Sequence, residues 1–390
     1  MGGAAGAILE YLSRQRDAMV GFLERLTLAE SPSSEPQSQR AARALLADAF
    51  TELGYKPLML PGSESGGQLY ARPADRERGR ARQLIIGHYD TVWPLGTLKT
   101  MPFEFDGSVV KGPGVFDMKG GLAQLVFALK ALRALSLTAT VTPVVFLNSD
   151  EEIGSHESTR YIRHLARISN RALVLEPSLG IGGAIKTTRK GVGRYTVTVK
   201  GRAAHAGLDP DQGASAILEL SFVIQKLFAL NDAASGLTVN VGTIDGGLRP
   251  NVVAPESRAV IDVRVAAQAD AERVDTAIRA IEPETPGIEL EIEGRIGRPA
   301  LEPTPRNRAL WQVARALGRD LGLELTEARA GGGSDGNTTS QYTATLDGLG
   351  PVGDGAHAHH EQLDLDMTIE RAALLALLLL SPPVEGARHE

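Results

Sequence analysis

The stretch Lys111–Leu132, KGPGVFDMKGGLAQLVFALKAL, places a glycine-rich turn and an acidic residue directly before an apolar helix. The turn at 112–114 leads to Asp117, and from Leu122 onward apolar residues recur at helical spacing. Asp117 therefore lies in a tight loop at a helix N-terminus, where backbone N–H groups and the helix dipole favour an anion. A simple helix cap would also explain such an acid, so its role depends on the rest of the chain.

Strand–loop–helix units surround this stretch and predict a mostly parallel sheet. Gln83–Ile86 and Val141–Leu147 read as buried strands, and Ala172–Leu175 is a third, shorter one. Because strands alternate with helices, we expect an α/β domain with helices on both faces of its sheet. In such sheets the chemistry gathers beyond the carboxyl ends of the strands.

The pattern changes at about residue 190, where Gly193–Val199 alternates between apolar and polar side chains. From there to about residue 300 the predicted elements follow the order βαββαβ, which is that of a ferredoxin-like unit. We therefore predict a discontinuous catalytic domain, residues 1–189 and 301–390, with an inserted lid or dimerisation domain at residues 190–300. An edge strand or a helix of this unit offers a surface for a homodimer.

Length and composition exclude several kinds of protein and of site. The 390 residues carry a formal net charge of −6, which argues against nucleic acid as a partner. The chain has no cysteine, so any metal must bind to His, Asp or Glu. The longest apolar run, Ala372–Leu380, is too short to span a membrane. No signal peptide is visible, so a cytoplasmic protein is the expectation.

Side chains of the kinds that bind metals follow the predicted strands. His88 and Asp90 come directly after the first strand, and their spacing puts both side chains on one side of the chain. The carboxylate can then hold one ring nitrogen of the histidine while the other nitrogen binds a metal. A loop histidine followed by a turn aspartate would show the same pattern.

Further candidates are acidic residues and a group of histidines. The acids Asp150–Glu152 follow the second strand, where crowded like charges are unfavourable unless a cation compensates them; a solvated turn is the alternative. Glu176 follows the apolar third strand, which suggests a position near the end of the sheet, although a lone glutamate there is more often a surface residue. His357, His359 and His360 share the segment GDGAHAHHEQ, and local sequence does not decide which of them binds a metal.

Seven segments together resemble the zinc-dependent peptidase and deacylase family that includes carboxypeptidase G, aminoacylase and succinyl-diaminopimelate desuccinylase. They are GHYDTV (87–92), GPGVFDMKGG (112–121), NSDEEIGS (148–155), LEPS (175–178), GRAAHAG (201–207), GGGSD (331–335) and GDGAH (353–357). The segments follow the order and spacing of that family and span nearly the whole chain. The carboxypeptidase G branch is the most similar.

The resemblance implies a fold of the di-zinc exopeptidase type and two Zn²⁺ ions per chain, with Asp117 bridging them. His88 and Glu176 would complete one metal site, and Glu152 and His357 the other. Co²⁺ or Mn²⁺ could substitute, because histidine and carboxylate ligands suit several ions.

The resemblance also implies roles for residues that do not bind metal. Glu151 would be the general acid and base, and Asp90 would orient His88. His205 would reach the active site of the partner subunit and stabilise the oxyanion, although a polar loop histidine is the plain alternative. A cis peptide bond would precede Met118.

Substrate recognition is implied for the inserted domain and for one glycine-rich loop. Arg264 would bind the free carboxylate of the substrate, and Asn251 would supply a neighbouring polar contact. Arg298 would favour an acidic C-terminal side chain, with a plain surface arginine as the alternative. Backbone N–H groups of three residues could face the same carboxylate, namely those of Gly332, Gly333 and Ser334.

These expectations describe a di-zinc metallo-exopeptidase that releases a C-terminal amino acid, with glutamate as the candidate, from a small peptide or N-acyl conjugate. An N-acyl amino-acid deacylase or desuccinylase with the same site is the main alternative. A metal-containing binding protein without turnover is a further alternative, but it predicts the loss of a ligand or of the base. Neither a ligand nor the base is missing here.

Overall fold

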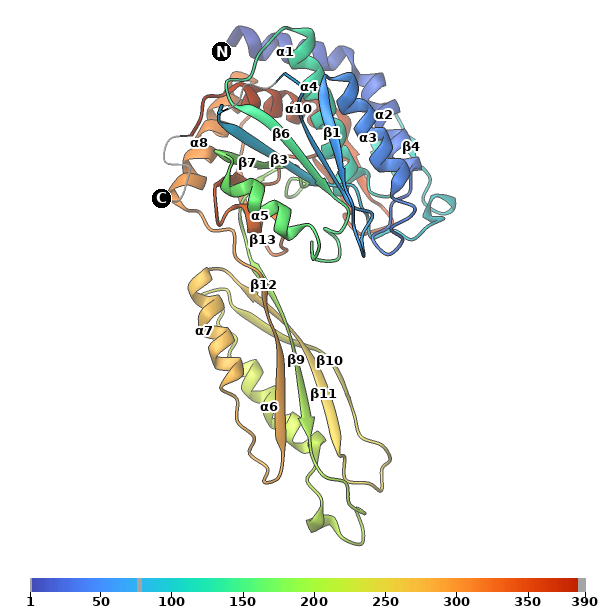
Figure 1. Cartoon of the computed structure of the whole chain (residues 1–390), viewed down its shortest axis with the longest axis vertical. Helices are drawn as coiled ribbons and strands as arrows, with labels where there is room; N and C mark the ends of the chain where they lie inside the picture. Colours follow the sequence, from blue (N-terminus) through green and yellow to red (C-terminus); the bar gives the residue numbers. More distant parts are fainter. Residues whose placement is uncertain (1, 76–78, 385–390) are drawn as a thin grey trace. The chain divides into compact units, whose positions relative to one another are not determined.

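The computed structural model describes residues 2–75 and 79–384, and the chain divides into two compact units (Figure 1). Unit 1 comprises Met1–Thr188, Pro303–Arg329 and Ser334–Glu390. Unit 2 comprises Arg189–Glu302 and Ala330–Gly333.

A six-stranded sheet forms the centre of unit 1. In spatial order its strands are β1 (Tyr55–Leu60), β2 (Gln68–Pro73), β6 (Thr142–Asn148), β3 (Arg82–His88), β7 (Arg171–Val174) and β14 (Ala344–Leu346). The last four strands are parallel to one another, whereas β1 and β2 form an antiparallel edge. The predicted mostly parallel sheet is thereby confirmed.

Successive residues of the central strands enter two different apolar cores. Ile85 and Val145 belong to the larger core, whereas their neighbours Ile86 and Val144 belong to the smaller one on the opposite face. Because both faces of the sheet are covered, every residue of β6 is buried. This explains why the strands read as continuous apolar runs rather than as alternating patterns.

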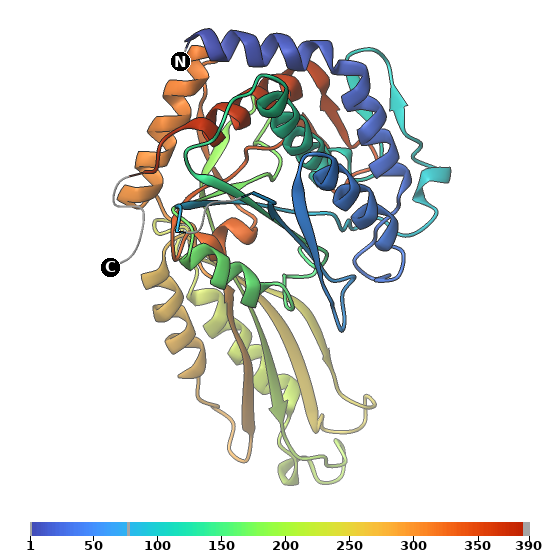
Figure 2. The same ribbon diagram turned by 45° about the horizontal axis from the view of Figure 1, so that its top comes forward.

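Helices cover the two faces of this sheet unequally (Figures 1 and 2). The larger core is built with α1 (Gly2–Arg14), α2 (Arg16–Leu28), α3 (Arg40–Glu52), α4 (Gly120–Ala134), α8 (Pro305–Asp320) and α10 (Leu365–Leu380). On the other face, the smaller core contains residues of α5 (Thr159–Arg167). The short helix α9 (Asp335–Thr339) follows the glycine-rich loop.

Short strands complete the structure, and these were not predicted because two to five residues carry little periodicity. One small sheet has the order β15 (Gly353–Asp354), β16 (Gln362–Asp364), β5 (Val109–Lys111) and β4 (Glu104–Phe105). A second pairs β8 (Ile185–Arg189) with β13 (Glu327–Ala330). Brief helical turns lie at Thr97–Lys99, Val115–Lys119 and Pro210–Gln212. The pairing of β16 with β5 matters most, because it joins segments some 250 residues apart.

Unit 2 is a four-stranded antiparallel sheet with two helices on one face, as Figures 1 and 2 show. Its elements in chain order are β9 (Gly191–Lys200), α6 (Ala216–Ala229), β10 (Thr238–Gly246), β11 (Glu256–Val265), α7 (Gln268–Arg279) and β12 (Glu289–Arg298). The spatial order β10-β11-β9-β12 confirms the predicted ferredoxin-like βαββαβ arrangement. Alternate residues of β9, such as Tyr195 and Val197, are buried beneath the helices, so the opposite face of the sheet stays open.

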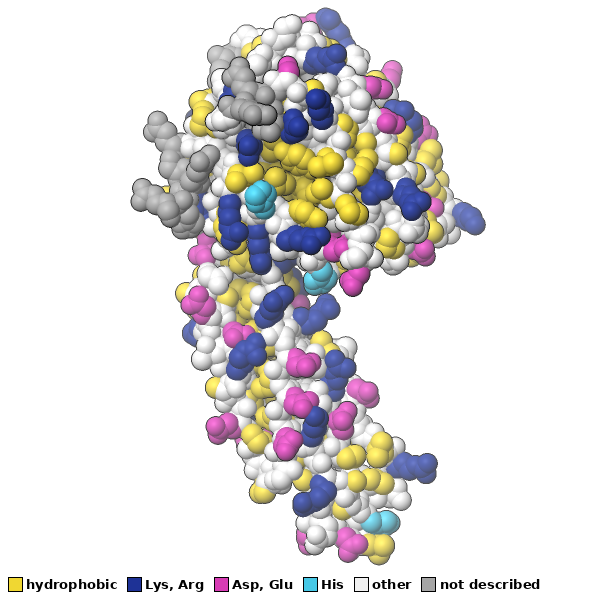
Figure 3. All heavy atoms as spheres, viewed as in Figure 1, with side chains coloured by type: hydrophobic (Ala, Val, Ile, Leu, Met, Phe, Trp, Pro, Cys, Tyr) yellow, Lys and Arg dark blue, Asp and Glu magenta, His cyan; other side chains and the backbone are white. Residues whose placement is uncertain are grey.

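On the face drawn in Figure 3, acidic and basic side chains are interspersed over the surface of both units. Hydrophobic side chains gather over the sheet of unit 1, where α5 leaves part of β1 uncovered and Leu58 is 54% exposed. Within residues 2–75 and 79–384, no helix is both long enough and apolar enough to cross a membrane.

Candidate functional site

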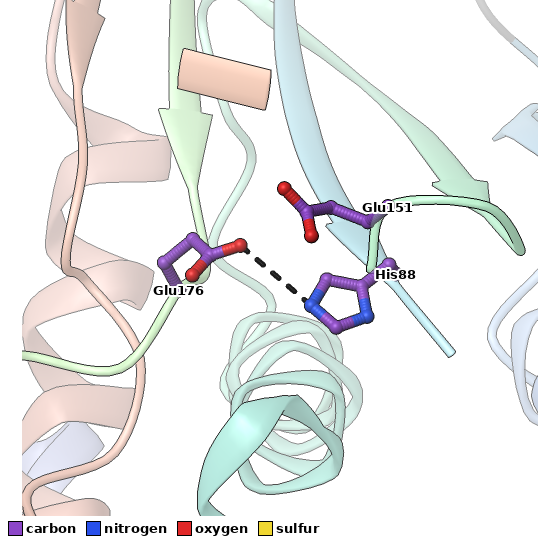
Figure 4. A group of neighbouring side chains, drawn as sticks. All are labelled: His88, Glu151 and Glu176. Carbon is purple, nitrogen blue, oxygen red and sulfur yellow. Dashed lines mark ion pairs between the residues drawn. The ribbon is translucent and has the colours of Figure 1, made fainter. Parts of the chain in front are cut away.

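Parallel strands bring several predicted site residues to one edge of the unit 1 sheet. β3 ends at His88, level with the last residue of β6. On the other side of β3, Val174 of β7 lies opposite Ile86, so that Glu176 follows at the level of His88. In Figure 4, Glu176 extends from the end of β7 and Glu151 from the loop after β6, both toward the ring of His88.

These three side chains form a first group of potential metal ligands. Ligand atoms of His88, Glu151 and Glu176 all lie within 4.8 Å of one another. The Nε2 atom of His88 is 3.6 Å from Oε1 of Glu176, the contact marked in Figure 4. All three residues are buried, with exposed fractions of 1%, 9% and 7%.

A second group shares His88 with the first and adds Asp117 and Glu152. Ligand atoms of His88, Asp117 and Glu152 also lie within 4.8 Å of one another. Oδ1 of Asp117 is 3.3 Å from Nε2 of His88, whereas Oδ2 is 3.5 Å from Nε2 of His357. The same His357 nitrogen is 3.1 Å from Oε2 of Glu152. The two carboxylate oxygens of Asp117 therefore face different histidines.

The three histidines that the sequence left undecided have different neighbours. The ring of His359 packs against Trp93, with 5.4 Å between ring centroids. His360 is exposed, and its Nε2 lies 3.8 Å from Oδ2 of Asp354. Only His357 is placed against the acids of the second group, from a backbone with φ of 61°.

Asp90 holds both His88 and the acidic loop Asp150–Glu152 in place. Nδ1 of His88 is 3.0 Å from the backbone oxygen of Asp90 and 3.4 Å from its Oδ1. Since both neighbours are oxygens, Nδ1 carries the proton and donates it, and Nε2 faces the acids. The fully buried Asp90 carboxylate also accepts hydrogen bonds from the backbone N–H groups of Glu151 (3.3 Å) and Glu152 (3.2 Å).

Crowding of acids and histidines shifts their pKa values. Burial acts to lower the pKa of His88, but Asp117 and Asp90 outweigh it and raise the pKa well above its usual range. Hydrogen bonds to Asp117 and Glu152 raise the pKa of His357 to about 10. Burial, together with the charges of Asp117 and Glu151, raises the pKa of Glu152 to about 7. Without a metal the acids thus hold protons on the histidines, and metal binding would release them.

The residues present fit a metal centre. Three buried atoms, Nε2 of His88, Oδ1 of Asp117 and Oε1 of Glu152, make no well-aligned hydrogen bond among the described residues, although the first two lie 3.3 Å apart. Each such orphan atom costs about 1–3 kcal/mol unless something else binds it. Imidazole nitrogens and carboxylate oxygens without thiolates suit zinc and also cobalt or manganese.

Glycines shape the loop that carries Asp117. Gly114 has φ of 75°, a backbone conformation that favours glycine. A Cβ atom on Gly121, in the first turn of α4, would lie 2.3 Å from the backbone oxygen of Leu175. The helix can therefore start directly against the end of β7 only because a glycine stands there. The peptide bond between Asp117 and Met118 is cis, as the resemblance implies.

The two arginines predicted to bind substrate lie in one row of the unit 2 sheet. Arg264 of β11 and Arg298 of β12 both lie opposite Val192 of β9, on the face without helices. The guanidinium of Arg264 donates two hydrogen bonds to Asp262, at 2.8 and 3.0 Å. Both arginines are half-buried.

Asn251 lies beside His205, at the far end of the unit 2 sheet from Arg264. Ala206 donates its backbone N–H to the oxygen of Asn251 at 3.1 Å, and His205 pairs with the next residue along. Asn251 lies beyond the Glu256 end of β11, whereas Arg264 lies near the other end of this strand. At about 3.3 Å per residue, the distance from Glu256 to Arg264 is roughly 26 Å. Sequence reasoning could not see that the loop before β11 folds against the loop after β9.

The ring of His205 has a defined orientation of its own. Its Nδ1 accepts hydrogen bonds from the backbone N–H groups of Gly207 and Leu208, each at 3.1 Å. The other nitrogen, Nε2, must then carry the proton. His205 therefore presents a hydrogen-bond donor, the kind of group that an oxyanion requires.

The glycine-rich loop makes hydrogen bonds within the chain through three of its residues. The backbone N–H of Ser334 donates to Oδ1 of Asn337 at 2.8 Å, and its hydroxyl caps α9. Ser334 therefore cannot also donate its N–H to a substrate. The backbone carbonyls of Gly332 and Gly333 accept hydrogen bonds from Nη1 of Arg189, at 3.2 and 3.3 Å.

Sequence reasoning missed two buried charged residues next to the site, Lys119 and Glu361, each 1% exposed. The ammonium of Lys119 donates to the backbone oxygen of Ala29 at 3.0 Å. Burial lowers the pKa of Lys119 to about 7, although the charges of Glu361 and Glu30 oppose that shift. No periodicity marks these two residues, because their partners come from distant segments.

Comparison with known proteins gives a family match over most of the chain. The model of peptidase family M20/M25/M40 matches residues 84–381. Carboxypeptidase G2 of Pseudomonas sp. (strain RS-16) is 27% identical over 378 residues, covering 94% of this chain and 89% of that protein. Succinyl-diaminopimelate desuccinylase of Azoarcus sp. (strain BH72) is 28% identical over 358 residues, covering 86% of this chain and 91% of that protein.

Solved structures share the fold over nearly the full length. A tripeptidase from Staphylococcus aureus has a TM-score of 0.77 at 19% identity, covering 93% of this chain and 97% of its own. The M20 family metallo-carboxypeptidase Sso-CP2 from Sulfolobus solfataricus has a TM-score of 0.70 at 16% identity, covering 93% of this chain and 98% of its own. At these identities the likeness concerns the fold.

Proposed function

Since this chain belongs to peptidase family M20/M25/M40, and is thus a hydrolase, we propose that it is a two-zinc exopeptidase. It would release a C-terminal amino acid, with glutamate as the candidate, from a small peptide or an N-acyl conjugate. The observation that carries the proposal is the position of Asp117. Its Oδ1 faces His88 and its Oδ2 faces His357, so one carboxylate lies between a ligand-type residue of each proposed metal site.

In this proposal Asp117 is shared between two metal ions. His88 and Glu176 would complete one site, and Glu152 and His357 the other. The ions, when bound, supply an activated water molecule at neutral pH and polarise the scissile carbonyl. Asp90 keeps the proton of His88 on Nδ1, which leaves Nε2 to act as a ligand.

Glu151 is the proposed general base. Asp90 accepts its backbone N–H at 3.3 Å, and its side chain lies within 4.8 Å of both His88 and Glu176. From there it would take the proton of the attacking water and pass it to the leaving amine. Because Glu151 lies among the ligand-type atoms, metal content and activity must be measured separately.

The row of arginines supports a substrate with two carboxylates. Arg264 and Arg298 flank Val192 on neighbouring strands, so about 10 Å separates their Cα atoms. Two long guanidinium side chains at that spacing suit the two carboxylates of a terminal glutamate. Backbone N–H groups of Gly332 and Gly333 are further candidates for binding one of these carboxylates.

The geometry of unit 2 also supports a homodimer. His205 and Asn251 lie roughly 26 Å along the sheet from Arg264, too far to share one small substrate with it in the same chain. In a homodimer, His205 would instead act on the substrate bound by the partner subunit, where its Nε2–H would donate a hydrogen bond to the oxyanion.

A specific edge of unit 2 is suited to that dimer. The edge strand β10 carries Asp245 as its only charged residue, whereas the other edge, β12, alternates Glu289, Glu291 and Glu293, charges that discourage pairing. Between β10 and α6 lies a hollow of about 410 Å³. Ile217 and Ile244 line this hollow and are 50% and 62% exposed. Pairing of this edge with the same edge of a second copy would bury both side chains.

Metal analysis of the purified protein tests the proposal. We expect about two zinc ions per chain and hydrolysis that a chelator abolishes and zinc restores. Replacing Asp117→Asn should remove both ions together, because both would lose a ligand. Asp354→Asn, an exposed change in a neighbouring segment, should leave the metal content unchanged. A wild-type protein that binds no metal and gains no activity on addition of zinc would contradict the proposal.

A substrate panel distinguishes the alternatives. N-acyl-glutamates, N-acetyl amino acids and N-succinyl compounds should be compared by kcat/KM. We expect N-acyl-glutamates to be preferred, because the two arginines bind carboxylates. Preference for an acetyl or succinyl donor irrespective of the amino acid would support a deacylase or desuccinylase instead. Absence of turnover with metal bound would indicate a binding protein.

A further inference from the structure

Glu361 is a buried carboxylate that binds the loop of Asp117 from behind. Its Oε1 accepts the backbone N–H groups of Phe116 (2.9 Å) and Asp117 (3.0 Å). Its Oε2 accepts the N–H of Gly114 (2.9 Å) and the indole N–H of Trp93 (2.7 Å). A carboxylate offers about four acceptor positions, and these four donors use them all.

This set of contacts shows that Glu361 is not itself a ligand. An oxygen that already accepts two hydrogen bonds has no lone pair to offer a metal. Neither group of neighbouring ligand-type side chains, as found within the described part of the chain, includes Glu361. What Glu361 contacts instead is the backbone of Asp117, whose side chain faces both His88 and His357.

The same residue belongs to the turn that carries His357. Its backbone N–H donates to the oxygen of Ala358 at 2.9 Å, and its own backbone oxygen accepts the N–H of Gly112 at 3.3 Å. The next residue, Gln362, begins β16, which pairs with β5 just before the Asp117 loop. Glu361 thus joins two segments that each supply a ligand-type side chain.

We propose that Glu361 is a positioning residue that sets the Asp117 loop against His357 and thereby raises the affinity of the metal site formed by Asp117, Glu152 and His357. The inference rests on the proposed two-metal site. Its physical basis is the short range of metal bonds. Zinc–ligand distances of about 2.0–2.2 Å tolerate little displacement, and loss of a group that orients a ligand typically weakens metal binding about 10- to 100-fold.

The variant Glu361→Gln tests this positioning at constant size. The amide nitrogen cannot accept a hydrogen bond, so two of the four N–H donors would face another donor. We expect at least one of the two zinc affinities, measured by competition with a chromogenic chelator, to fall about 10- to 100-fold. Trp93→Phe is the matched control. It removes the one donor outside the Asp117 loop, and zinc affinity should change little.

Folding is checked separately by the melting temperature of the metal-free protein, with zinc titrated well below it. A folded Glu361→Gln variant that binds both zinc ions as tightly as wild type would overturn the inference while leaving the proposed function intact. If the wild type itself binds no zinc, the proposed function fails instead.

A measurement on the wild type covers the case in which Glu361→Gln does not fold. In the metal-free protein, the amides of Gly114, Phe116 and Asp117 should already be protected from hydrogen exchange, because Glu361 accepts them without a metal. Rapid exchange of all three amides, with β3 still protected, would contradict the inference.

Discussion

Apart from the exposed His357, the proposed metal ligands of unit 1 are largely buried, whereas the candidate site residues of unit 2 are half-buried or exposed. In unit 1, His88, Asp90 and Glu361 are at most 1% exposed, and Asp90 alone accepts hydrogen bonds from two backbone N–H groups and a serine. In unit 2, Arg264 and Arg298 lie half-buried on an open sheet face. Changes in unit 1 should therefore disturb a whole network, whereas changes in unit 2 should alter one contact each.

The largest effect on activity without loss of metal is expected in unit 1, for Glu151→Gln. Loss of a general base should lower kcat about 10²- to 10⁴-fold. Zinc content should stay at the wild-type value, because the amide keeps the size of the side chain and the proposed ligands remain. Elemental analysis and steady-state kinetics on the same sample provide the check. Loss of one zinc ion would show that Glu151 is a ligand, and unchanged kcat would rule it out as the base.

Unit 2 should give the next effect, through His205→Ala. Loss of one donor to the oxyanion should lower kcat about 10²- to 10³-fold, with KM and zinc content little changed. His164→Ala, at an exposed position on α5, is the control and should behave as wild type.

Mixed dimers of His205→Ala and Glu151→Gln subunits then test whether His205 acts across the dimer. If each variant complements the other, part of the activity should return. No recovery after confirmed subunit exchange would place His205 outside the partner's site and weaken the contrast between the units.

A smaller effect should follow from Arg298→Ala, and it should be selective. Loss of hydrogen bonds to a charged group is worth about 1.5–3 kcal/mol, or roughly 10- to 100-fold in kcat/KM for a substrate ending in glutamate. Substrates that end in alanine should change little. Arg295→Ala, an exposed arginine on the same strand, is the matched control. An equal loss for both kinds of substrate would show that Arg298 supports the unit rather than reads the side chain.

The smallest effect concerns stability, through Glu157 beside the acidic loop. Its carboxylate accepts hydrogen bonds from the backbone N–H and hydroxyl groups of Ser63 and Ser65. Burial would raise the pKa of Glu157, but these hydrogen bonds lower it from 4.5 to about 2. Stabilisation is therefore present above pH 4.5 and is lost as the pH falls toward 2.

Glu157→Gln should thus cost about 1 kcal/mol of unfolding free energy at pH 7, since solvent screens this partly exposed group. The difference from wild type should shrink as the pH falls from 4.5 toward 2. Denaturant unfolding at several pH values measures it, with the exposed Glu35→Gln as a control. A difference that does not depend on pH would show that the hydrogen bonds to the ionised carboxylate are not its source.

Residues at strand ends were predictable because parallel strands align their carboxyl ends. His88 and Glu176 each follow an apolar run, and in the structure Nε2 of His88 lies 3.6 Å from Oε1 of Glu176. The histidine of the second group was harder to assign. His357, His359 and His360 share one local sequence, and only the fold of their turn gives them different neighbours.

Contacts between distant segments were not predictable from local patterns. Asn251 lies beside His205, because two loops extend the sheet beyond its regular strands. Ser334 was expected to offer its N–H to a substrate, yet Asn337 already accepts it. Glu361 gave no signal at all, since three of its four donors are backbone groups about 245 residues away and the fourth is the indole of Trp93.

The sequence by itself determined the order of the longer strands and helices, the change of pattern at about residue 190, and which side chains can bind metal, because these depend on periodicity and residue type. Only the tertiary structure decided that the two oxygens of Asp117 face different histidines. That arrangement depends on how β16 pairs with β5 and on where Glu361 holds the Asp117 loop. Such distances of a few ångströms result from packing between segments far apart in the chain, which no local pattern records.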